Sequence, residues 1–289
     1  MLPWLDRAAA RRGFDAAGGA DVLAREVESR LVERLEYIKL EAKHIVDAGC
    51  GNGSRIALRN RFADADFYGV DFSLRRLRDA RAPASYLSRL KGLFQASRDH
   101  WLAADMAQLP LAAGSCQLLW SNLSLAWGAD PLACFKEWHR VLSVDGLLMF
   151  TTYGPDTLKE LRAAFGPDAF PHVHSFVDMH DLGDMMVASG FAEPVMDMEM
   201  LTLTYADVPA MLADLRATRQ TNAHRQRRRT LTGKQRWADM SERYAAMARA
   251  GRIPASFEIV YGHAWKPAPR LAGDGRQIVH FKARPGSLS

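Results

Sequence analysis

Five short apolar runs along the chain alternate with stretches that have helical periodicity. The runs occupy residues 44–48, 66–70, 101–104, 116–120 and 147–150. One intervening stretch places Leu132, Phe135, Trp138 and Leu142 at helical spacing. Apolar strands that alternate with helices are typical of a parallel sheet covered on both faces. The pattern therefore predicts a doubly wound α/β fold.

The flanking regions extend this prediction. Residues 20–40 form an expected amphipathic helix, and 178–189 form another. Apolar runs at 194–205 and 257–265 are expected as two further strands at the sheet edge. We predict a mostly parallel, Rossmann-like, seven-stranded sheet with an inserted helical cap. The expected parts are an N-terminal helical segment (1–40), a core (41–206 and 253–268), the basic helical cap (207–252) and a tail (269–289).

Composition narrows the cellular setting. Of the 289 residues, 48% are hydrophobic, yet no apolar run reaches the roughly 18–20 residues that span a bilayer. Charged residues occur within the first seven positions, where a signal peptide would begin its apolar stretch, so a signal peptide is not expected. The three cysteines, Cys50, Cys116 and Cys134, show no CxxC spacing and indicate free thiols in a reducing compartment. We expect a cytoplasmic protein with no membrane contact.

The net charge of +5 is unevenly distributed. Residues 216–236 carry eight Arg and Lys and no acidic residue, so the rest of the chain nets −3. A basic segment on a slightly acidic body favours an anionic partner, although a solvated helical face is the alternative. RNA is a poorer candidate, because only Trp237 supplies a nearby aromatic ring.

A glycine-rich loop follows the first predicted strand and reads Asp47-Ala48-Gly49-Cys50-Gly51-Asn52-Gly53. Glycines allow a sharp turn and a close approach of the backbone to a ligand. The spacing is GxGxG, whereas a dinucleotide fingerprint would be GxGxxG with pyrophosphate at a helix N-terminus. The acidic residue before the loop suits S-adenosylmethionine, which carries a sulfonium and an ammonium but no phosphate.

Polar residues also end the other predicted strands. In a parallel sheet these ends share one edge, where ligands bind. Asp71 is placed to accept hydrogen bonds from ribose hydroxyls, Asp105 from an adenine amino group, and Asn122 is expected near the reacting methyl group. Phe72 and Met106 are expected to pack beside the nucleoside. Each alone could be an ordinary strand-end residue, but their shared register favours one cofactor site.

These residues resemble the class I methyltransferases over residues 40–155. Three further stretches are similar to the family that methylates the malonyl group on acyl carrier protein in biotin synthesis: 119–127 (LWSNLSLAW), 152–162 (TYGPDTLKELR) with 231–233 (LTG), and 261–265 (YGHAW). Phe14 stands where that family usually has Tyr, and Asn52 where Thr is more usual. The first difference removes a phenolic hydroxyl.

The resemblance implies transfer of a methyl group from S-adenosylmethionine to the free carboxylate of a malonyl thioester. Trp127 and Tyr153 are candidates for walling the acceptor pocket, and Arg162 for holding the carboxylate, with a solvated helix arginine as its alternative. The basic segment would steer the acidic acyl carrier protein that carries malonyl-phosphopantetheine and would hold its phosphate. The candidates for this contact are Arg225, Arg227, Arg228 and Arg229.

Other functions stay open at this point. The chain could methylate a quinone, an RNA or a protein, or it could be a non-catalytic assembly factor that binds the cofactor. A metal site is not expected, because His172, His174 and His180 match no closed zinc set. A hydrolase is not expected either, because the chain has no GxSxG elbow.

Overall fold

The computed structural model describes residues 4–16, 21–51, 56–81, 98–128 and 130–269. Its helices are α1 (Arg7–Asp15), α2 (Val22–Glu36), α3 (Ile56–Arg61), α4 (Leu74–Arg81), η1 (Leu125–Trp127), α6 (Pro131–Val141), α7 (Lys159–Phe165), α8 (Met179–Ala188), α9 (Val208–Ala217) and α10 (Lys234–Ala245). Its strands are β1 (His44–Ala48), β2 (Asp66–Asp71), β3 (Asp99–Ala103), β4 (Cys116–Ser121), β5 (Leu142–Tyr153), β6 (Ala192–Tyr205) and β7 (Ile253–Trp265).

The seven strands form one sheet in the order β3-β2-β1-β4-β5-β7-β6. The five strands from β3 to β5 run parallel, and β7 pairs antiparallel with both β5 and β6. The predicted mostly parallel, seven-stranded fold is therefore confirmed. Each of the seven apolar runs that we read as a strand overlaps one, although the sequence pattern places the start of β5 five residues late and that of β7 four residues late.

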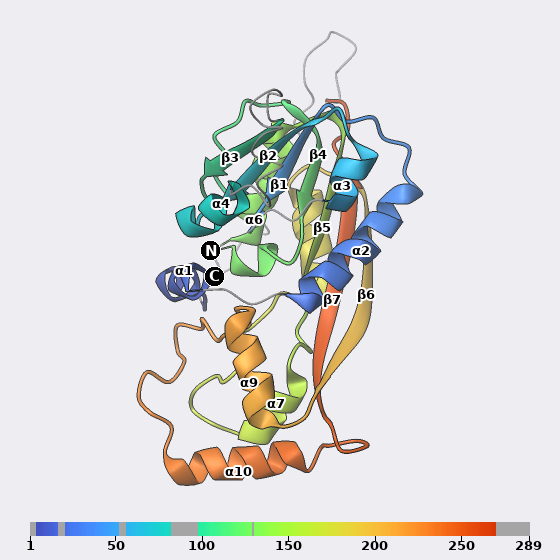
Figure 1. Ribbon diagram of the computed structural model, residues 1–289. Coiled ribbons are helices and arrows are strands. Elements are labelled where there is room, and N and C mark those ends of the chain that lie inside the picture. Colours follow the sequence, from blue (N-terminus) through green and yellow to red (C-terminus); the bar gives the residue numbers. More distant parts are fainter. Residues whose placement is uncertain (1–3, 17–20, 52–55, 82–97, 129, 270–289) are drawn as a thin grey trace, which may run out of the picture.

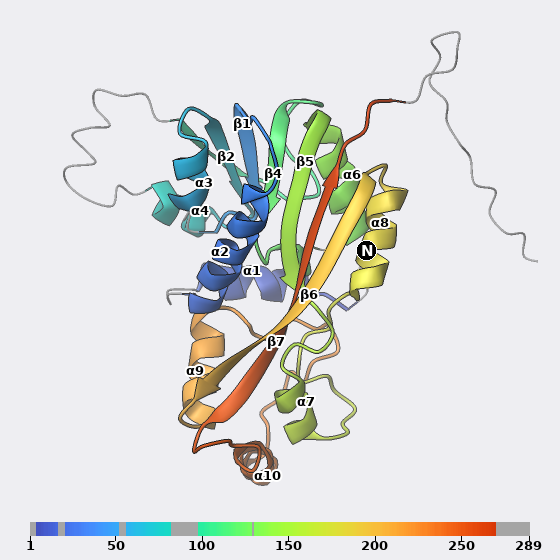
Figure 2. The ribbon, with the colours of Figure 1, turned by 90° about the vertical axis from the view of Figure 1, so that its right-hand side faces the viewer.

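Helices cover both faces of the sheet (Figures 1 and 2). On one face, α2 and α3 pack against alternate residues of the central strands. The predicted stripe of α2, Leu23, Val27, Leu31 and Leu35, is buried there. On the other face, α6 and α8 bury Phe135, Trp138, Leu182 and Met186. Two hydrophobic layers thus fix the sheet whose carboxyl edge carries the polar residues.

β6 and β7 are the longest strands and extend beyond the parallel part of the sheet. Their far ends reach α7, α9 and α10, which lie together at the lower end of the molecule in Figures 1 and 2. We call these three helices, with the connecting residues 166–178 and 218–233, the cap. α9 and α10 fall within the segment 207–252, whereas α7 follows β5 and joins them from the core.

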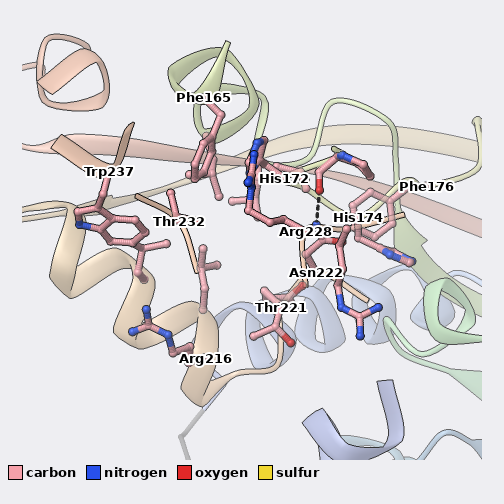
Figure 3. A pocket seen from close by; sticks show the side chains of 18 of the residues that line it. Phe165, His172, His174, Phe176, Arg216, Thr221, Asn222, Arg228, Thr232 and Trp237 are labelled. Carbon is pink, nitrogen blue, oxygen red and sulfur yellow. Dashed lines mark hydrogen bonds between the residues drawn. The ribbon is translucent and has the colours of Figure 1, made fainter. Parts of the chain in front are cut away.

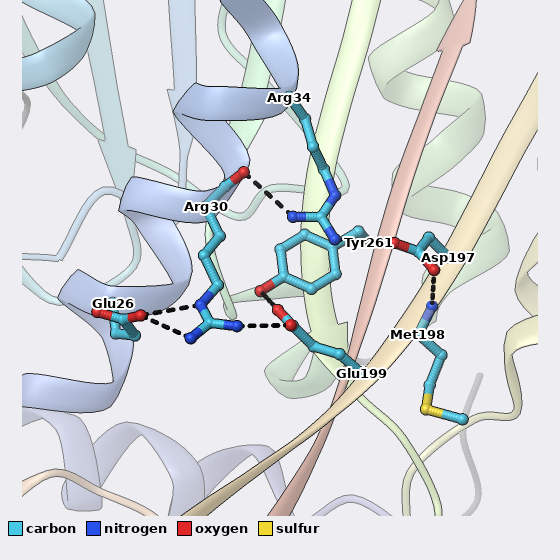
Figure 4. A network of polar contacts seen from close by, with 7 residues as sticks. All are labelled: Glu26, Arg30, Arg34, Asp197, Met198, Glu199 and Tyr261. Carbon is cyan, nitrogen blue, oxygen red and sulfur yellow. Dashed lines mark hydrogen bonds and ion pairs between the residues drawn. The ribbon is translucent and has the colours of Figure 1, made fainter.

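Charged residues fasten α2 to the sheet edge (Figure 4). Arg30 forms an ion pair with Glu199 at 2.6 Å, and Arg34 pairs with Asp197 at 2.8 Å. Tyr261 lies beneath the Arg34 guanidinium at 3.7 Å and donates its hydroxyl hydrogen to Glu199. The YGHAW stretch that β7 contributes therefore packs the edge of the sheet.

Backbone and side-chain bonds join α1 to the cap. Leu5 forms an isolated β-bridge with His224, and the amide of Asp6 donates to the carbonyl of Ala223 at 2.8 Å. The Asp6 carboxylate caps the first turn of α1 and pairs with Arg227 at 2.9 Å. We call these contacts the latch. They hold α1 over the carboxyl edge of the sheet.

Candidate active site

The glycine loop after β1 adopts a conformation that favours glycine. Gly49 has φ of +80° and Gly51 has φ of +56°. A Cβ on Gly49 would lie 2.2 Å from the Cβ of Ser124, so the loop passes directly over the β4–η1 turn. Asn52 and Gly53 lie outside the described residues. Asp47, at the end of β1, is buried.

Asp71 organises the loop from the neighbouring strand. Its carboxylate accepts hydrogen bonds from the amides of Gly51 at 2.9 Å and Ser73 at 2.7 Å. The side chain is 7% exposed, and this burial raises its pKa despite the two amides and nearby Arg76. Asp71 therefore fixes the glycine loop and presents a carboxylate at the edge of β2.

The end of β3 contributes a second acidic residue and an apolar neighbour. Asp105 pairs with Arg7 of α1 and accepts the amide of Ala107 at 2.9 Å. Met106 is buried, and with Phe72, Asp105 and Arg7 it lines a cavity of about 320 Å³ under α1. The residues predicted for adenine recognition thus share one cavity.

Phe14 closes this region from above as part of α1. Its ring meets the ring of Phe72 edge-on at 5.6 Å and that of Trp127 at 5.3 Å. Arg76 lies over the same ring, 5.3 Å from its centre. Phe14 is therefore held by aromatic packing, and none of these contacts requires the phenolic hydroxyl that the family's usual Tyr would supply.

The glycine loop, Asp71 and the strand ends enclose an adjoining cavity of about 90 Å³, which we call the cofactor cavity. Its lining includes Gly49, Gly51, Asp71, Phe72, Met106, Asn122, Trp127 and Tyr153, which the sequence predicted, together with Phe14, Asp21, Arg76, Thr218 and Gln220. Asn122 donates to the carbonyl of Ala24 at 2.8 Å and accepts from the hydroxyl of Thr151 at 2.7 Å. The side-chain amide of Asn122 is therefore fixed between α2 and β5.

Tyr153 ends β5 in the cofactor cavity. Its side chain is buried, and its phenolic oxygen accepts a hydrogen bond from the amide of Gln220 in the cap. Burial and the nearby carboxylate of Asp21 raise the pKa of Tyr153, so the phenol stays protonated. Since the oxygen already accepts a bond, its own hydrogen is free to be donated.

A third cavity, of about 330 Å³, lies between the sheet edge and the cap, and we call it the acceptor cavity (Figure 3). Apolar side chains of α7 and α9 form part of its wall, namely Leu161, Phe165, Leu212 and Leu215, together with Leu158 just before α7. Polar groups from the cap complete it, including Arg216, Asn222, Arg227, Arg228 and Thr232. Trp127 and Gln220 line both this cavity and the cofactor cavity. The two cavities therefore share a wall.

The predicted partner arginines make contacts within the chain. Arg225 donates to the carbonyl of Leu5 at 2.9 Å, and Arg227 takes part in the latch. Arg228 lies 3.6 Å from Asp168, which also pairs with Arg236 at 2.5 Å and His172 at 2.6 Å. Arg229 lies 3.7 Å from Asp6 with 70% of its side chain exposed.

Arg162 does not take the position that we expected. Its guanidinium donates to the carbonyls of Pro155 at 2.9 Å and Thr157 at 3.3 Å, and it is absent from the described lining of both cavities. These carbonyls belong to the turn that follows β5. Arg162 therefore stabilises this turn, which corrects its prediction as the carboxylate anchor.

Several site residues escaped the sequence reading. Gln220 and His174 reach the cavities from connecting segments of the cap, and Arg76 reaches them from α4, where no strand-end pattern marks these residues. Within the described residues, no group of three or more His, Cys, Asp or Glu is arranged to hold a metal ion. In that same part of the chain, no helix has the length and apolar content to cross a membrane.

Comparisons with known proteins agree with this geometry. Residues 46–150 match the family model described as a methyltransferase domain. The YcgJ protein of Bacillus subtilis has a similar fold, with a TM-score of 0.56, 14% identity, and coverage of 83% of this chain and 99% of that one.

Two curated relatives are both named malonyl-[acyl-carrier protein] O-methyltransferase. The one from Gallionella capsiferriformans is 48% identical, over 95% of this chain and 96% of its own. The one from Laribacter hongkongensis is 45% identical, over 96% of each chain. At this identity and coverage, the chain belongs to the malonyl-[acyl-carrier protein] O-methyltransferase family.

Proposed function

We propose that the protein transfers a methyl group from S-adenosylmethionine to the free carboxylate of a malonyl thioester carried by acyl carrier protein. The observation that carries the proposal is the shared wall of Trp127 and Gln220 between the cofactor and acceptor cavities. Methyl transfer requires the acceptor oxygen to lie in line with the methyl carbon and the sulfur of the donor. Two adjoining cavities with a common wall allow donor and acceptor to be bound in this arrangement.

The cofactor cavity, together with the adjoining cavity under α1, suits a sulfonium nucleoside. Its floor is the backbone of Gly49 and Gly51, where a side chain would collide, and its acidic groups are Asp21 and Asp71. Asp71 would hold the ribose hydroxyls, and Asp105 with Met106 and Phe72 would hold adenine. Asp47 and Asn122 would lie toward the amino acid part and the methyl group. S-adenosylmethionine, when bound, supplies an electrophilic methyl group and leaves as a neutral thioether.

The acceptor needs no general base from the protein. Carboxylic acids titrate near pH 4, so a malonyl carboxylate is already an anion at neutral pH. The task of the chain is to align the oxygen with the methyl group and to exclude water. α1 with Phe14 covers the cofactor side, and the cap covers the acceptor side. Trp127 and Tyr153 would wall the space between them.

The exposed part of the cap suits an acidic carrier protein. Arg229 and Lys234 are exposed, and Leu231 is 96% and Trp237 40% exposed beside them. Trp237 also lines the acceptor cavity, so this surface adjoins its opening. Basic and apolar side chains around an opening would bind an acidic partner and let its pantetheine arm enter. Arg225, which is bound to the carbonyl of Leu5, and Arg227 and Arg228 in the cavity wall would add to the positive electrostatic potential that attracts the acidic partner.

Free thiols support a cytoplasmic setting. Cys116 and Cys134 are buried, Cys50 is half-buried, and none of these described cysteines forms a disulfide. Such thiols persist in a reducing compartment.

The test incubates purified protein with labelled S-adenosylmethionine and either malonyl- or acetyl-carrier protein, and detects the methyl ester by mass spectrometry. A malonyl-dependent ester is expected. Tight nucleoside binding without the ester would favour another acceptor, such as a quinone, an RNA or a protein, or a non-catalytic assembly role.

The docking surface has its own test. Lys234 lies away from the Asp6 ion pairs, and Lys234→Glu should raise KM for the carrier-bound substrate about threefold to tenfold and leave the KM for S-adenosylmethionine unchanged. Lys39→Glu, which alters an exposed lysine after α2, is the matched control. Equal KM values for both variants would reject this surface.

A further inference from the structure

His174 is a buried polar residue of the acceptor cavity to which the proposed reaction gives no task so far. It lies in the loop between α7 and α8 and is 3% exposed. Its ring stacks on Trp127 at a centroid distance of 5.1 Å and meets Phe176 edge-on at 5.3 Å. In Figure 3, His174 and Phe176 lie at one end of the cavity, while Trp237 and Arg216 lie at the other.

In the described part of the chain, neither polar atom of His174 forms a hydrogen bond of normal geometry, although both ring nitrogens are buried. The backbone of Ala126 lies near enough to favour the protonated ring, but it makes no bond of that geometry. Buried polar groups are nearly always paired, because an unpaired one loses its bonds to water without compensation. A fixed, unpaired imidazole in the lining of a ligand cavity indicates that the ligand supplies the missing partner.

The charge state of the ring limits what it can do. Burial and the neighbouring His224 lower the pKa of His174 to about 4, and this outweighs the opposite effect of the Ala126 backbone. At neutral pH the imidazole is therefore uncharged, with one N–H donor and one acceptor nitrogen. His172, in the same cavity, differs because it is already paired with Asp168.

A neutral donor suits a carboxylate that must act as a nucleophile. A guanidinium that binds both oxygens would stabilise their lone pairs and make the attack slower. A single N–H restrains one oxygen and leaves the other less perturbed. His174 stacks on Trp127, which also lines the cofactor cavity, so a carboxylate bound there would lie beside the shared wall.

We propose that the N–H of His174 holds the non-reacting oxygen of the acceptor carboxylate while the other oxygen takes the methyl group. The inference rests on the proposed function, since it names the residue that recognises the charged end of the malonyl group. In the transfer, a carbon–oxygen bond forms as the sulfur–carbon bond breaks. No proton passes through His174, which acts by binding and orientation.

The test compares two thioesters that differ only in the carboxylate. Equilibrium binding of malonyl- and acetyl-carrier protein is measured in the presence of the demethylated nucleoside, beside kcat and KM for methyl transfer. His174→Phe keeps an aromatic ring but has no donor. It should lower kcat/KM for the malonyl substrate about 10- to 100-fold, the usual effect of removing one hydrogen bond to a charged group. It should also abolish the preference for malonyl over acetyl.

Two matched comparisons separate recognition from structure. His174→Gln and His174→Met have side chains of similar size, and only the glutamine can donate, so part of the preference should return in the glutamine variant alone. This pair carries the test if His174→Phe does not fold. His180→Asn alters a histidine with 85% of its side chain exposed and should change neither thioester affinity nor turnover. Nucleoside affinity should stay within about twofold in every variant.

The outcomes distinguish the two proposals. If the wild type forms the ester and the donor-free variants keep their preference for malonyl, the role of His174 is overturned and the proposed function stands. If the wild type binds the nucleoside but neither methylates nor prefers the malonyl thioester, the proposed function fails and the role of His174 fails with it.

Discussion

Asp6 and Arg227 lie 221 positions apart in the chain and form an ion pair at 2.9 Å. The same carboxylate accepts the amide of Ala9 and so caps α1. One side chain therefore starts the helix that covers the cofactor cavity and fastens it to the cap. Asp6 thus connects α1, which covers the cofactor cavity, to the cap, which forms a wall of the acceptor cavity.

Replacing Asp6 should loosen α1 in two separable steps. Asp6→Asn keeps a capping oxygen and loses the ion pair, whereas Asp6→Ala loses both, and a lost cap costs about 1 kcal/mol. We expect nucleoside affinity, measured by calorimetry, to fall about fivefold in Asp6→Ala and less in Asp6→Asn. Asp178→Ala removes the cap of α8 and serves as the control. A similar loss of affinity in that control would contradict a specific role for the latch.

The role of the glycine loop can be tested by comparing two glycines that both have a positive φ angle, Gly49 in the loop and Gly114 outside it. Gly114 has φ of +68° and open space around its Cβ position, so Gly114→Ala should cost about 1–2 kcal/mol from backbone strain alone. Gly49→Ala adds a collision with Ser124 and should be more destabilising. Thermal unfolding measures both costs. Gly49→Ala should also lose nucleoside binding, and retention of normal affinity would argue against the loop as the cofactor floor.

Thiol reactivity offers a readout that is independent of turnover. Burial raises the pKa of Cys116 to about 12 and also raises that of Cys134, so both should resist alkylation at pH 8. Cys50 is half-buried in the glycine loop and should react. Saturating S-adenosylhomocysteine should slow modification of Cys50 at least tenfold, as followed by peptide mass spectrometry. Unchanged labelling would place the nucleoside elsewhere.

His174 also predicts a pH dependence of stability. Its folded pKa of about 4 lies below the unfolded value near 6.5, so the unfolded chain binds the proton more tightly. Stability is then present above pH 6.5 and is lost as the pH falls toward 4. Between pH 7 and 5 this group accounts for roughly 2 kcal/mol. In urea titrations, the free energy of unfolding of His174→Gln should fall less between pH 7 and 5 than that of the wild type, by this amount. An equal dependence of the unfolding free energy on pH in both proteins would contradict the lowered pKa of His174.

The sheet and its polar edge could be predicted because periodicity and chain direction determine them. Once β1, β2 and β4 are recognised as parallel strands, Asp47, Asp71 and Asn122 must share an edge. The stripe of α2 was equally readable, since its leucines and valine repeat every four residues. These features depend on short-range patterns that the sequence displays directly.

Other parts depend on contacts between distant segments. α1 buries only Ala10 among its own residues and is held by the latch, so no apolar stripe marks it. The arginines predicted to bind a partner are visible in the sequence as a basic group, but charge alone does not reveal that Leu5, Asp6 and Asp168 contact them. Arg162 was misassigned for the same reason, because its acceptors are backbone carbonyls. His174 lies in a loop, where neighbours follow from packing and leave no periodic signal.

The position of β7 has a consequence for how the molecule is made. β7 lies between β5 and β6 in space but follows the whole cap in the chain. During synthesis from the N-terminus, β6 emerges before the strand that will join it to the sheet. Until residue 265 leaves the ribosome, β5 and β6 both present open edges, which are templates for pairing with other chains. Ribosome-bound intermediates ending within the cap should therefore be more aggregation-prone than the finished protein.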